Sequence, residues 1–150
     1  LDYLCWIFGA VEEVFCVTGK QNFLELRGAE ESAAVILKFR NGVIGELHCD
    51  LLQRPSSRWC KIVGERGTIC WDFAENRVKL YAPFEKSWKV VLDSHGLDYT
   101  ITYVEEIRHL IECVQQKVPS INDFREGRQN LQLALKALES ARTGEFLEVA

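Results

Sequence analysis

The sequence predicts an α+β domain, a predominantly antiparallel open-faced sheet of about six strands with two long C-terminal helices packed on one face. Two pairs of apolar runs, joined at Asn41-Gly42 and at Glu65-Arg66, are typical of β-hairpins. In the last third of the chain the hydrophobic period changes from two residues to that of an α-helix. Because strands come first and helices last, the order favours α+β over alternating β-α-β units.

Length and composition narrow the class of protein. The chain has 150 residues, which fits one domain with a real core. Hydrophobic residues make up 47% and charged residues 27%, as in soluble globular proteins rather than disordered ones. No apolar run approaches the roughly 18 residues of a membrane span, and a net charge of −4 argues against nucleic acid as a partner. Because no secretory signal is visible, we expect a cytoplasmic protein.

The N-terminal segment predicts a helix end and then a strand. Residues 1–8 form the helix, Gly9 ends it, residues 11–18 form the strand, and residues 21–31 form a polar loop. The sequence has no Met and opens in the middle of an amphipathic segment without a cap. We therefore expect a piece of a longer protein, with a processed or trimmed terminus as the alternative.

The first hairpin is predicted at Asn41-Gly42, between apolar runs over residues 33–39 and 43–52. Asn-Gly is the strongest short hairpin signal, because a type I′ turn needs positive φ at both central residues. With these two residues as the loop, Phe39 faces Ile44, and the remaining pairs follow in steps of two. Both faces are then apolar in part, which suits a sheet covered by helices on one face and contacted on the other.

The second hairpin joins residues 58–64 to residues 67–73. A two-residue loop pairs three sets of residues, Cys60 with Trp71, Ile62 with Ile69, and Arg58 with Phe73. One face is then nearly all apolar, and a one-residue slip would destroy that separation, so the pattern supports this register.

The remaining elements are two short strands, two helices and a closing strand, at residues 78–81, 88–92, 101–114, 131–141 and 145–150. Pro119 ends the first helical region. Ser120 or Asn122 is expected to cap the second helix, and Gly144 to end it.

The six cysteines, at positions 5, 16, 49, 60, 70 and 113, are widely spaced and contain no C-x-x-C pair. Zinc sites favour close pairs, and disulfides need an oxidising compartment. We therefore interpret all six as small buried apolar residues. The predicted register also places Cys60 and Cys70 on opposite faces of the sheet, which argues against a bond between them.

The most concentrated ionisable cluster is Glu46, His48 and Asp50, which alternate and so share one strand face. Because side chains on one strand point in parallel rather than converging, we favour an exposed or interface face over a metal or catalytic site. His95 is interpreted as a turn residue and His109 as a surface residue of a helix.

The linker over residues 53–59 offers a binding site. Arg54 and Arg58, with Trp59 beside a proline turn, could bind an anionic or sugar-like ligand, because a guanidinium forks onto carboxylate or phosphate. The alternative is a solvated loop. The Gly64 to Gly67 segment is a hairpin turn, not a phosphate cradle, so the chain shows no complete active site.

Five segments in order resemble the C-terminal domain of Gfo/Idh/MocA-type oxidoreductases, at residues 1–9, 37–45, 62–72, 103–110 and 134–144. The resemblance covers essentially the whole chain. Residues 51–58 are also similar to members linked to surface-sugar biosynthesis.

The resemblance implies a two-domain enzyme in which an N-terminal Rossmann domain holds NAD or NADP. The C-terminal domain would contact a sugar-like substrate and form a homo-oligomer through its open sheet face. We assign substrate contact to Arg54, Arg58 and Tyr103. Hydride would move between a sugar carbon and the nicotinamide, while a lysine or histidine handles the hydroxyl proton.

The catalytic groups that the resemblance implies lie outside this sequence. The lysine of Glu-Lys-Pro belongs to the first domain, and the histidine would precede Asp2 by three residues, so only Asp2 of that motif remains. We therefore assign no catalytic, cofactor-binding or metal-binding residue here and expect no activity from this chain alone. A non-catalytic dimerisation or ligand-binding module is the alternative, and a metal protein using Glu46, His48 and Asp50 is a third hypothesis.

Overall fold

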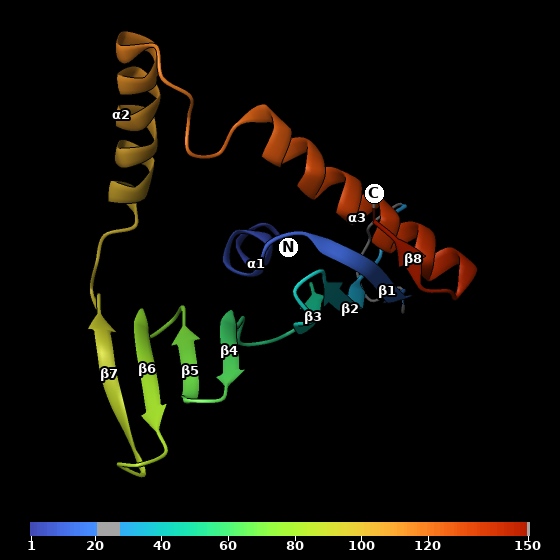
Figure 1. Cartoon of the computed structure of the whole chain (residues 1–150), viewed down its shortest axis with the longest axis horizontal. Helices are drawn as coiled ribbons and strands as arrows, with labels where there is room; N and C mark the ends of the chain where they lie inside the picture. The colour runs from blue at the N-terminus through green and yellow to red at the C-terminus, as the bar shows by residue number, and fades with distance from the viewer. Residues whose placement is uncertain (21–27, 150) are drawn as a thin grey trace. The chain divides into compact units, whose positions relative to one another are not determined.

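The computed structural model describes residues 1–20 and 28–149. The chain divides into two compact units: unit 1 contains Leu1–Leu52 and Pro119–Ala150, and unit 2 contains Gln53–Val118 (Figure 1). Each unit holds one four-stranded antiparallel sheet. The predicted α+β class is confirmed. The described residues form eight strands, where the sequence predicts about six, and each strand overlaps a segment with a strand pattern.

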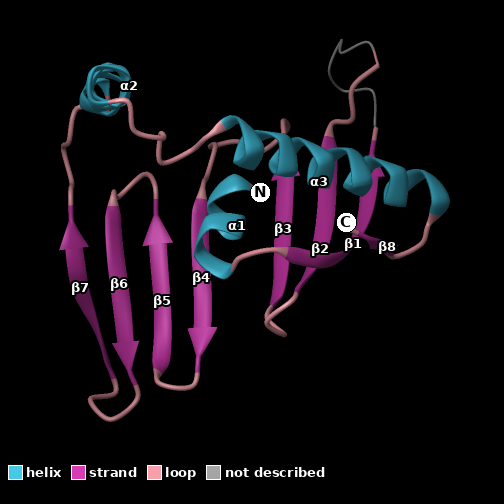
Figure 2. Cartoon of the chain, turned by 45° about the horizontal axis from the view of Figure 1, so that its top comes forward, coloured by secondary structure: helices cyan, strands magenta, loops and turns pink. Residues whose placement is uncertain are grey.

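Unit 1 contains a short helix, a sheet and a long helix (Figure 2). Its elements are α1 Asp2–Phe8, β1 Val11–Gly19, β2 Ser32–Phe39, β3 Ile44–Asp50, α3 Phe124–Thr143 and β8 Leu147–Glu148. The strands follow the order β3-β2-β1-β8. Of the predicted loop over residues 21–31, the first seven residues lie outside the described part of the chain, and residues 28–31 have no regular structure.

The first hairpin has a different register from the predicted one. Lys38 pairs with Ile44, and the backbone N–H of Phe39 donates to the carbonyl of Val43 at 2.9 Å. The loop therefore has three residues and ends at Gly42, whose φ is 86°. Asn41 has no positive φ, so the type I′ turn and the Phe39–Ile44 pair were wrong by one residue. A three-residue loop that ends in a left-handed glycine is the next most common hairpin connection.

Asn41 contributes through its side chain instead. Its Nδ2 donates to the carbonyl of Phe8 at 2.9 Å, and its Oδ1 accepts from the N–H of Val43 at 3.2 Å. The hairpin turn is thereby tied to the end of α1.

The corrected register separates the two faces of the sheet in unit 1. Leu37 pairs with Gly45 and Val35 pairs with Leu47, rather than with Glu46 and His48. Gly45 fits closely at this point, because a Cβ there would lie 3.2 Å from the Phe39 ring.

The core of unit 1 lies between the sheet and α3. Val14, Leu37 and Phe39 from the sheet are at most 1% exposed, and Leu133 of α3 is 2% exposed. Ser140, fully buried on α3, accepts from the N–H of Cys16 at 3.0 Å and donates to the carbonyl of Glu145 at 2.6 Å. One hydroxyl therefore joins the long helix to the central strand and to the segment before β8.

The second long helix, α3, is capped one residue after the predicted Asn122 and three residues after the predicted Ser120. Asp123 caps it, accepting from the N–H groups of Arg125 at 2.8 Å and Glu126 at 3.1 Å. The expected caps, Ser120 and Asn122, do not fill this role, since the Ser120 hydroxyl donates to the Asn122 carbonyl at 2.6 Å. Gly144 ends α3 with a left-handed φ of 73°, as the sequence predicts.

Unit 2 contains four strands and one helix. They are β4 Trp59–Gly64, β5 Gly67–Asp72, β6 Arg77–Ala82, β7 Ser87–Asp93 and α2 Thr100–Gln116. The register of the second hairpin is confirmed in its three predicted positions: Cys60 pairs with Trp71, Ile62 pairs with Ile69, and the N–H of Phe73 donates to the carbonyl of Arg58 at 2.9 Å.

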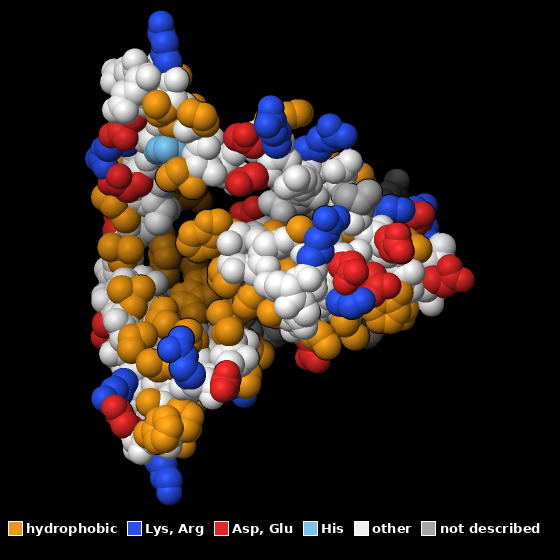
Figure 3. Space-filling model, in the orientation of Figure 1, with side chains coloured by type: hydrophobic (Ala, Val, Ile, Leu, Met, Phe, Trp, Pro, Cys, Tyr) orange, Lys and Arg blue, Asp and Glu red, His pale blue; other side chains and the backbone are white. Residues whose placement is uncertain are grey.

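Unit 2 buries very little. Among its described residues only Cys113 is a buried apolar side chain, at 8% exposure. The apolar stripe of α2, from Ile101 to Val114, is between 42 and 70% exposed. Figure 3 shows hydrophobic side chains exposed along the length of this unit.

All six cysteines are free, and Cys60 and Cys70 occupy opposite faces as predicted. Only Cys16 and Cys113 are buried, however, and Cys49 is exposed, so the interpretation of all six as buried residues was wrong. Cys49 is exposed because it lies on β3, an edge strand of its sheet. None of the helices in the described residues has the length and apolar composition that crossing a bilayer requires.

Candidate functional site

An arginine and three aromatic rings meet in unit 2. We call Arg58, Trp71, Phe73 and Tyr99 the arginine–aromatic cluster. The guanidinium carbon of Arg58 lies 5.5 Å from the ring centroids of both Trp71 and Phe73. Phe73 in turn stacks on Tyr99, with centroids 4.9 Å apart and ring planes at 21°. The cluster follows from the register of the second hairpin, which places Arg58 opposite Phe73.

The cluster is held by backbone as well as by rings. The Tyr99 hydroxyl donates to the carbonyl of Phe73 at 3.1 Å, which fixes the residues before α2 against the end of β5. Trp71 meets the Phe73 ring edge-on, with centroids 6.1 Å apart. Arg58 therefore lies over rigid aromatic faces, where cation–π contact is worth about 0.5–1 kcal/mol at exposed sites.

This arrangement suits recognition of a ligand that has both a flat apolar side and a negative group. A planar guanidinium binds carboxylate or phosphate with two parallel hydrogen bonds, and stacking on rings limits its freedom before the ligand arrives. Phe73 and Tyr99 are 37 and 38% exposed, so their faces are accessible to a ligand in part.

The other two predicted contact residues lie on different elements. Arg54 precedes β4 in the linker, and its Nη1 donates to the carbonyl of Gln53 at 2.9 Å. Tyr103 lies on α2 and is 68% exposed. Of the three residues predicted to contact substrate, Arg58 belongs to the arginine–aromatic cluster, and Arg54 and Tyr103 do not.

Three further members of the cluster, Trp71, Phe73 and Tyr99, were not among the predicted site residues. Trp71 and Phe73 alternate on one strand, opposite Cys60 and Arg58, so the predicted pairing already placed them on the face that Arg58 shares. No local pattern marks Tyr99, since it is 26 residues away from its partner Phe73.

The predicted ionisable cluster shares one face of β3, as expected from its alternation. Glu46, His48 and Asp50 pair with Ile36, Ala34 and Ser32. His48 Nε2 lies 3.1 Å from Asp50 Oδ2. In the described part of the chain, no group of three or more His, Cys, Asp or Glu side chains could hold a metal ion.

The two other histidines have local roles. The N–H of His95 donates to Asp93 at 3.0 Å in the turn after β7, as its turn interpretation predicts. His109 is not simply a surface residue, because its Nε2 lies 3.5 Å from the sulfur of Cys113, one helical turn away.

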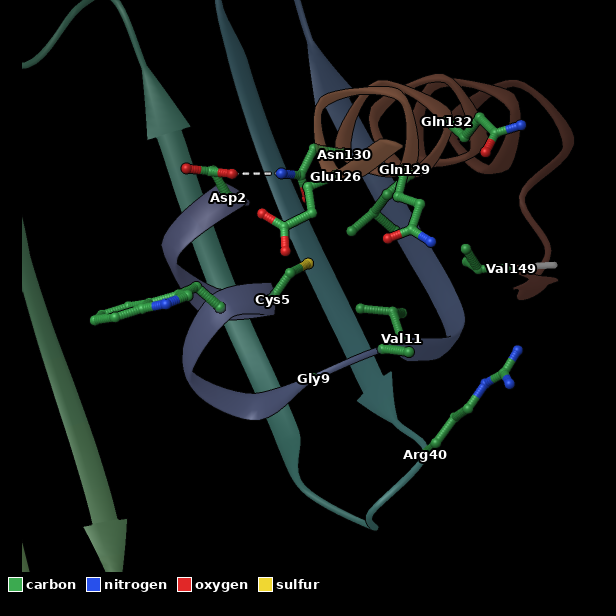
Figure 4. A pocket seen from close by; sticks show the side chains of 13 residues that line it. Asp2, Cys5, Gly9, Val11, Arg40, Glu126, Gln129, Asn130, Gln132 and Val149 are labelled. Atoms are coloured by element: carbon green, nitrogen blue, oxygen red, sulfur yellow. Dashed lines mark hydrogen bonds between the residues drawn. The ribbon is translucent and has the colours of Figure 1, made fainter. Parts of the chain in front are cut away.

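A concave feature lies in unit 1, between α1 and α3 (Figure 4). This groove encloses about 360 Å³, and its lining includes Cys5, Val11, Arg40, Glu126 and Leu133. The Cys5 thiol and the Glu126 carboxylate point toward one another across it. Burial raises the pKa of the Cys5 thiol, so the thiol is protonated at neutral pH.

The sequence matches an oxidoreductase family of the Gfo/Idh/MocA type over residues 1–149, in the part described as the C-terminal alpha/beta domain. The chain belongs to this family. The family predicted from five short motifs is therefore confirmed. Among curated proteins, none matches the sequence closely enough to indicate a relationship.

Solved structures of the Gfo/Idh/MocA family share the fold at low sequence identity. Levoglucosan dehydrogenase in complex with NADH and L-sorbose is 14% identical with a TM-score of 0.88, and the match covers 99% of this chain and 47% of that one. An oxidoreductase domain protein from Kribbella flavida is 17% identical with a TM-score of 0.86 and the same coverage.

A third structure, an oxidoreductase from Agrobacterium radiobacter in complex with NAD+, L-tartaric acid and magnesium, is 17% identical with a TM-score of 0.84; the match covers 99% of this chain and 46% of that one. The chain thus spans less than half the length of these three solved structures.

Proposed function

We propose that this domain is the substrate-binding and oligomerisation half of an NAD(P)-dependent dehydrogenase acting on a sugar or sugar derivative. The observation that supports substrate binding is the arginine–aromatic cluster, in a domain of an oxidoreductase family. Two structural neighbours were solved with a dinucleotide and a polyhydroxylated small molecule, L-sorbose or L-tartaric acid.

The residues of this chain do not fit a nicotinamide dinucleotide. Dinucleotides bind at a glycine-rich turn between a parallel strand and a helix. Both sheets here are antiparallel throughout the described residues, and the sequence has no G-x-G-x-x-G. The cofactor, which supplies or accepts the hydride, therefore belongs in our proposal to a Rossmann domain that precedes this one. We assign no catalytic step to this chain.

The proposed contribution of unit 2 is to bind and orient substrate. Arg58 would hold a negative or strongly polar group of the substrate, with Trp71 and Phe73 fixing the plane of its guanidinium. Arg54 and Tyr103 would complete the contacts from the linker and from α2. Because these interactions exist before the reacting bonds change, they serve ground-state binding.

The proposed second contribution is an oligomer interface on the open sheet faces. In unit 1, the face opposite α3 exposes Val17, Ile36 and Ile44, at 56, 40 and 73%. In unit 2, Val63 and Trp88 are 73 and 49% exposed on one sheet face. Apolar side chains exposed on an open sheet face support an interaction site, and a second copy of the chain is our proposed partner. The six free cysteines agree with a cytoplasmic location, where thiols stay reduced.

The test uses the full-length protein from the complete coding sequence. We expect reduction of NAD+ or NADP+ with one member of a panel of sugars, sugar acids and their derivatives, read by absorbance of the reduced nicotinamide. Arg58→Ala should raise KM, and Arg58→Lys should raise it less because the positive charge is kept. Arg66→Ala, in an exposed turn, should leave KM unchanged. A full-length protein that has no upstream nucleotide domain and binds no dinucleotide would exclude the enzyme. The exposed sheet faces would then favour the alternative, a non-catalytic dimerisation module.

A further inference from the structure

Two nearly perpendicular rings hold the guanidinium of Arg58 in place. Trp71 and Phe73 meet at 87°, and the guanidinium carbon lies 5.5 Å from the centroid of each ring. Contact with one ring restricts the guanidinium in one direction, and contact with the other restricts it in a second. Its N–H groups lie in one plane and form a rigid fork. A fork that is oriented in advance suits a planar partner, because two parallel hydrogen bonds require both groups to share a plane.

Tyr99 connects one of these rings to the start of helix α2. Its ring stacks on Phe73 with centroids 4.9 Å apart, and its hydroxyl donates to the Phe73 carbonyl at 3.1 Å. Its own carbonyl accepts from the N–H of Thr102 at 3.0 Å and from the Thr102 hydroxyl at 2.7 Å. The backbone of Tyr99 is therefore fixed in the first turn of α2, and its side chain is fixed to β5. Through Phe73, this residue limits where the Arg58 guanidinium can lie.

The charges beside the cluster favour a ligand with a single negative charge. Asp98 lies one residue before Tyr99, and its carboxylate accepts from the N–H of Thr100 at 2.9 Å. Hydrogen bonds from Thr100 lower the pKa of Asp98, so this carboxylate is ionised at neutral pH. The positive end of α2, a place where phosphate binds in many proteins, is therefore already occupied by a negative group. A phosphate ester carries about −1.5 to −2 charge at neutral pH and would be repelled more strongly than a carboxylate.

We propose that the arginine–aromatic cluster binds the carboxylate of a sugar acid, with Tyr99 as a positioning residue for this contact. The proposal rests on the proposed function and narrows its substrate from a sugar or sugar derivative to one that carries a carboxylate. Arg58 donates two parallel hydrogen bonds to the two carboxylate oxygens. Tyr99 acts through Phe73, by holding the ring against which the guanidinium lies.

The test measures binding to the full-length protein by isothermal titration calorimetry, with ligands that differ in one group. D-Glucuronate, D-galacturonate and D-mannuronate are each compared with the corresponding uronamide, in which a neutral amide replaces the carboxylate. We expect at least one uronate to bind about tenfold or more tightly than its amide, because a hydrogen bond between two charged groups contributes more than a bond to a neutral one. D-Glucose 6-phosphate should bind more weakly than that uronate.

Variants of the cluster report which residue binds the carboxylate. Arg58→Ala should lower the uronate affinity to that of the amide. Tyr99→Ala should weaken uronate binding by about fivefold, the contribution of one aromatic pair, and should leave amide binding nearly unchanged. Tyr99→Phe keeps the stacked ring and should stay within about twofold of wild type. Phe84→Ala, which removes a fully exposed ring from the turn between β6 and β7, is the matched control and should change neither affinity.

The comparison of uronate with amide in the wild-type protein needs no variant. Equal affinity for every uronate and its amide would overturn the proposal, as would tighter binding of D-glucose 6-phosphate. A preference for the uronate that survives in Arg58→Ala would overturn it as well, because the carboxylate would then bind elsewhere. Equal loss of uronate and amide binding in Tyr99→Ala would overturn the role of Tyr99, since it would reflect a general loss of structure.

NADH binding and turnover by the same protein keep the two proposals separate. Selective uronate binding without NADH binding means that the cluster is assigned correctly and the proposed dehydrogenase is wrong. Turnover of a neutral sugar, with no preference for a uronate over its amide, means the reverse.

Discussion

The two units contain the same kind of sheet and differ in what covers it. Each sheet has four antiparallel strands. Of the ten described hydrophobic side chains that are buried, nine lie in unit 1 and only Cys113 lies in unit 2. A fully buried aliphatic side chain stabilises the folded state by about 1.5–3 kcal/mol relative to an exposed one. Unit 1 therefore has a core of its own, whereas unit 2 leaves most of its described apolar side chains exposed.

The largest expected effect is a direct test of this difference. Leu37→Ala in unit 1 should lower the free energy of unfolding by about 2–5 kcal/mol, because Leu37 is fully buried and the site cannot collapse completely. Val63→Ala in unit 2, where the side chain is 73% exposed, should change it by less than about 0.5 kcal/mol in a monomer. Urea denaturation of the full-length protein gives both values.

The same pair of variants also distinguishes a single chain from an oligomer. If the Val63→Ala effect grows toward that of Leu37→Ala as protein concentration rises, a second copy covers unit 2. A Val63→Ala cost as large as that of Leu37→Ala at every concentration would contradict the view that this face of unit 2 is open in the single chain.

The second effect concerns substrate binding by unit 2. Arg54→Ala in the full-length enzyme should raise KM by about tenfold, the equivalent of 1.4 kcal/mol of binding, and lower kcat much less. The reason is that the linker would contact substrate equally in the ground state and in the transition state. Steady-state kinetics with the best substrate from the panel provide the check. An unchanged KM would remove Arg54 from the substrate site.

The third effect compares the starts of the two long helices. Asp123 caps α3 with two hydrogen bonds, so Asp123→Ala should cost about 1 kcal/mol of global stability. Asp98 accepts from the N–H of Thr100 at 2.9 Å at the start of α2, a similar local bond. Asp98→Ala should cost less, because α2 buries little and its first turn can open without disturbing the core of unit 1. Denaturation curves of the two variants give the two losses in the free energy of unfolding. Equal losses would mean that α2 is as firmly packed as α3.

The two hairpins show how far the sequence determines register. In the second hairpin one face is nearly all apolar, so only one pairing keeps the pattern, and Cys60–Trp71 was predicted correctly. In the first hairpin both faces are partly apolar, so a register shift of one residue changes the separation of apolar and polar side chains only slightly. Asn-Gly fits both a two-residue loop and a three-residue loop that ends in a left-handed glycine, and the φ of Asn41, which is not positive, distinguishes them.

The candidate sites show a similar limit. Arg58 and the face that it shares with Phe73 follow from local pairing and could be predicted. Tyr99 could not, because its contact depends on the path of the chain between β7 and α2. The groove in unit 1 joins residues such as Asp2 and Asn130, which are 128 positions apart, and no periodicity within α1 or α3 reports which helix the other one meets.

The smallest expected effect is a pH dependence confined to unit 2. A hydrogen bond from the backbone N–H of His95, together with the Arg77 guanidinium 3.0 Å away, lowers the pKa of the Asp93 carboxyl. A group whose pKa is lowered by folding stabilises the folded state above its unfolded pKa of about 3.9 and loses that contribution as pH falls through the folded pKa. The difference in stability between wild type and Asp93→Asn should therefore narrow as pH falls below about 5. Because the Arg77–Asp93 pair is exposed, added salt should reduce the gap at neutral pH. Thermal melts across that range measure it, and a gap that is independent of pH would show that the strand ends of unit 2 gain nothing from this pair.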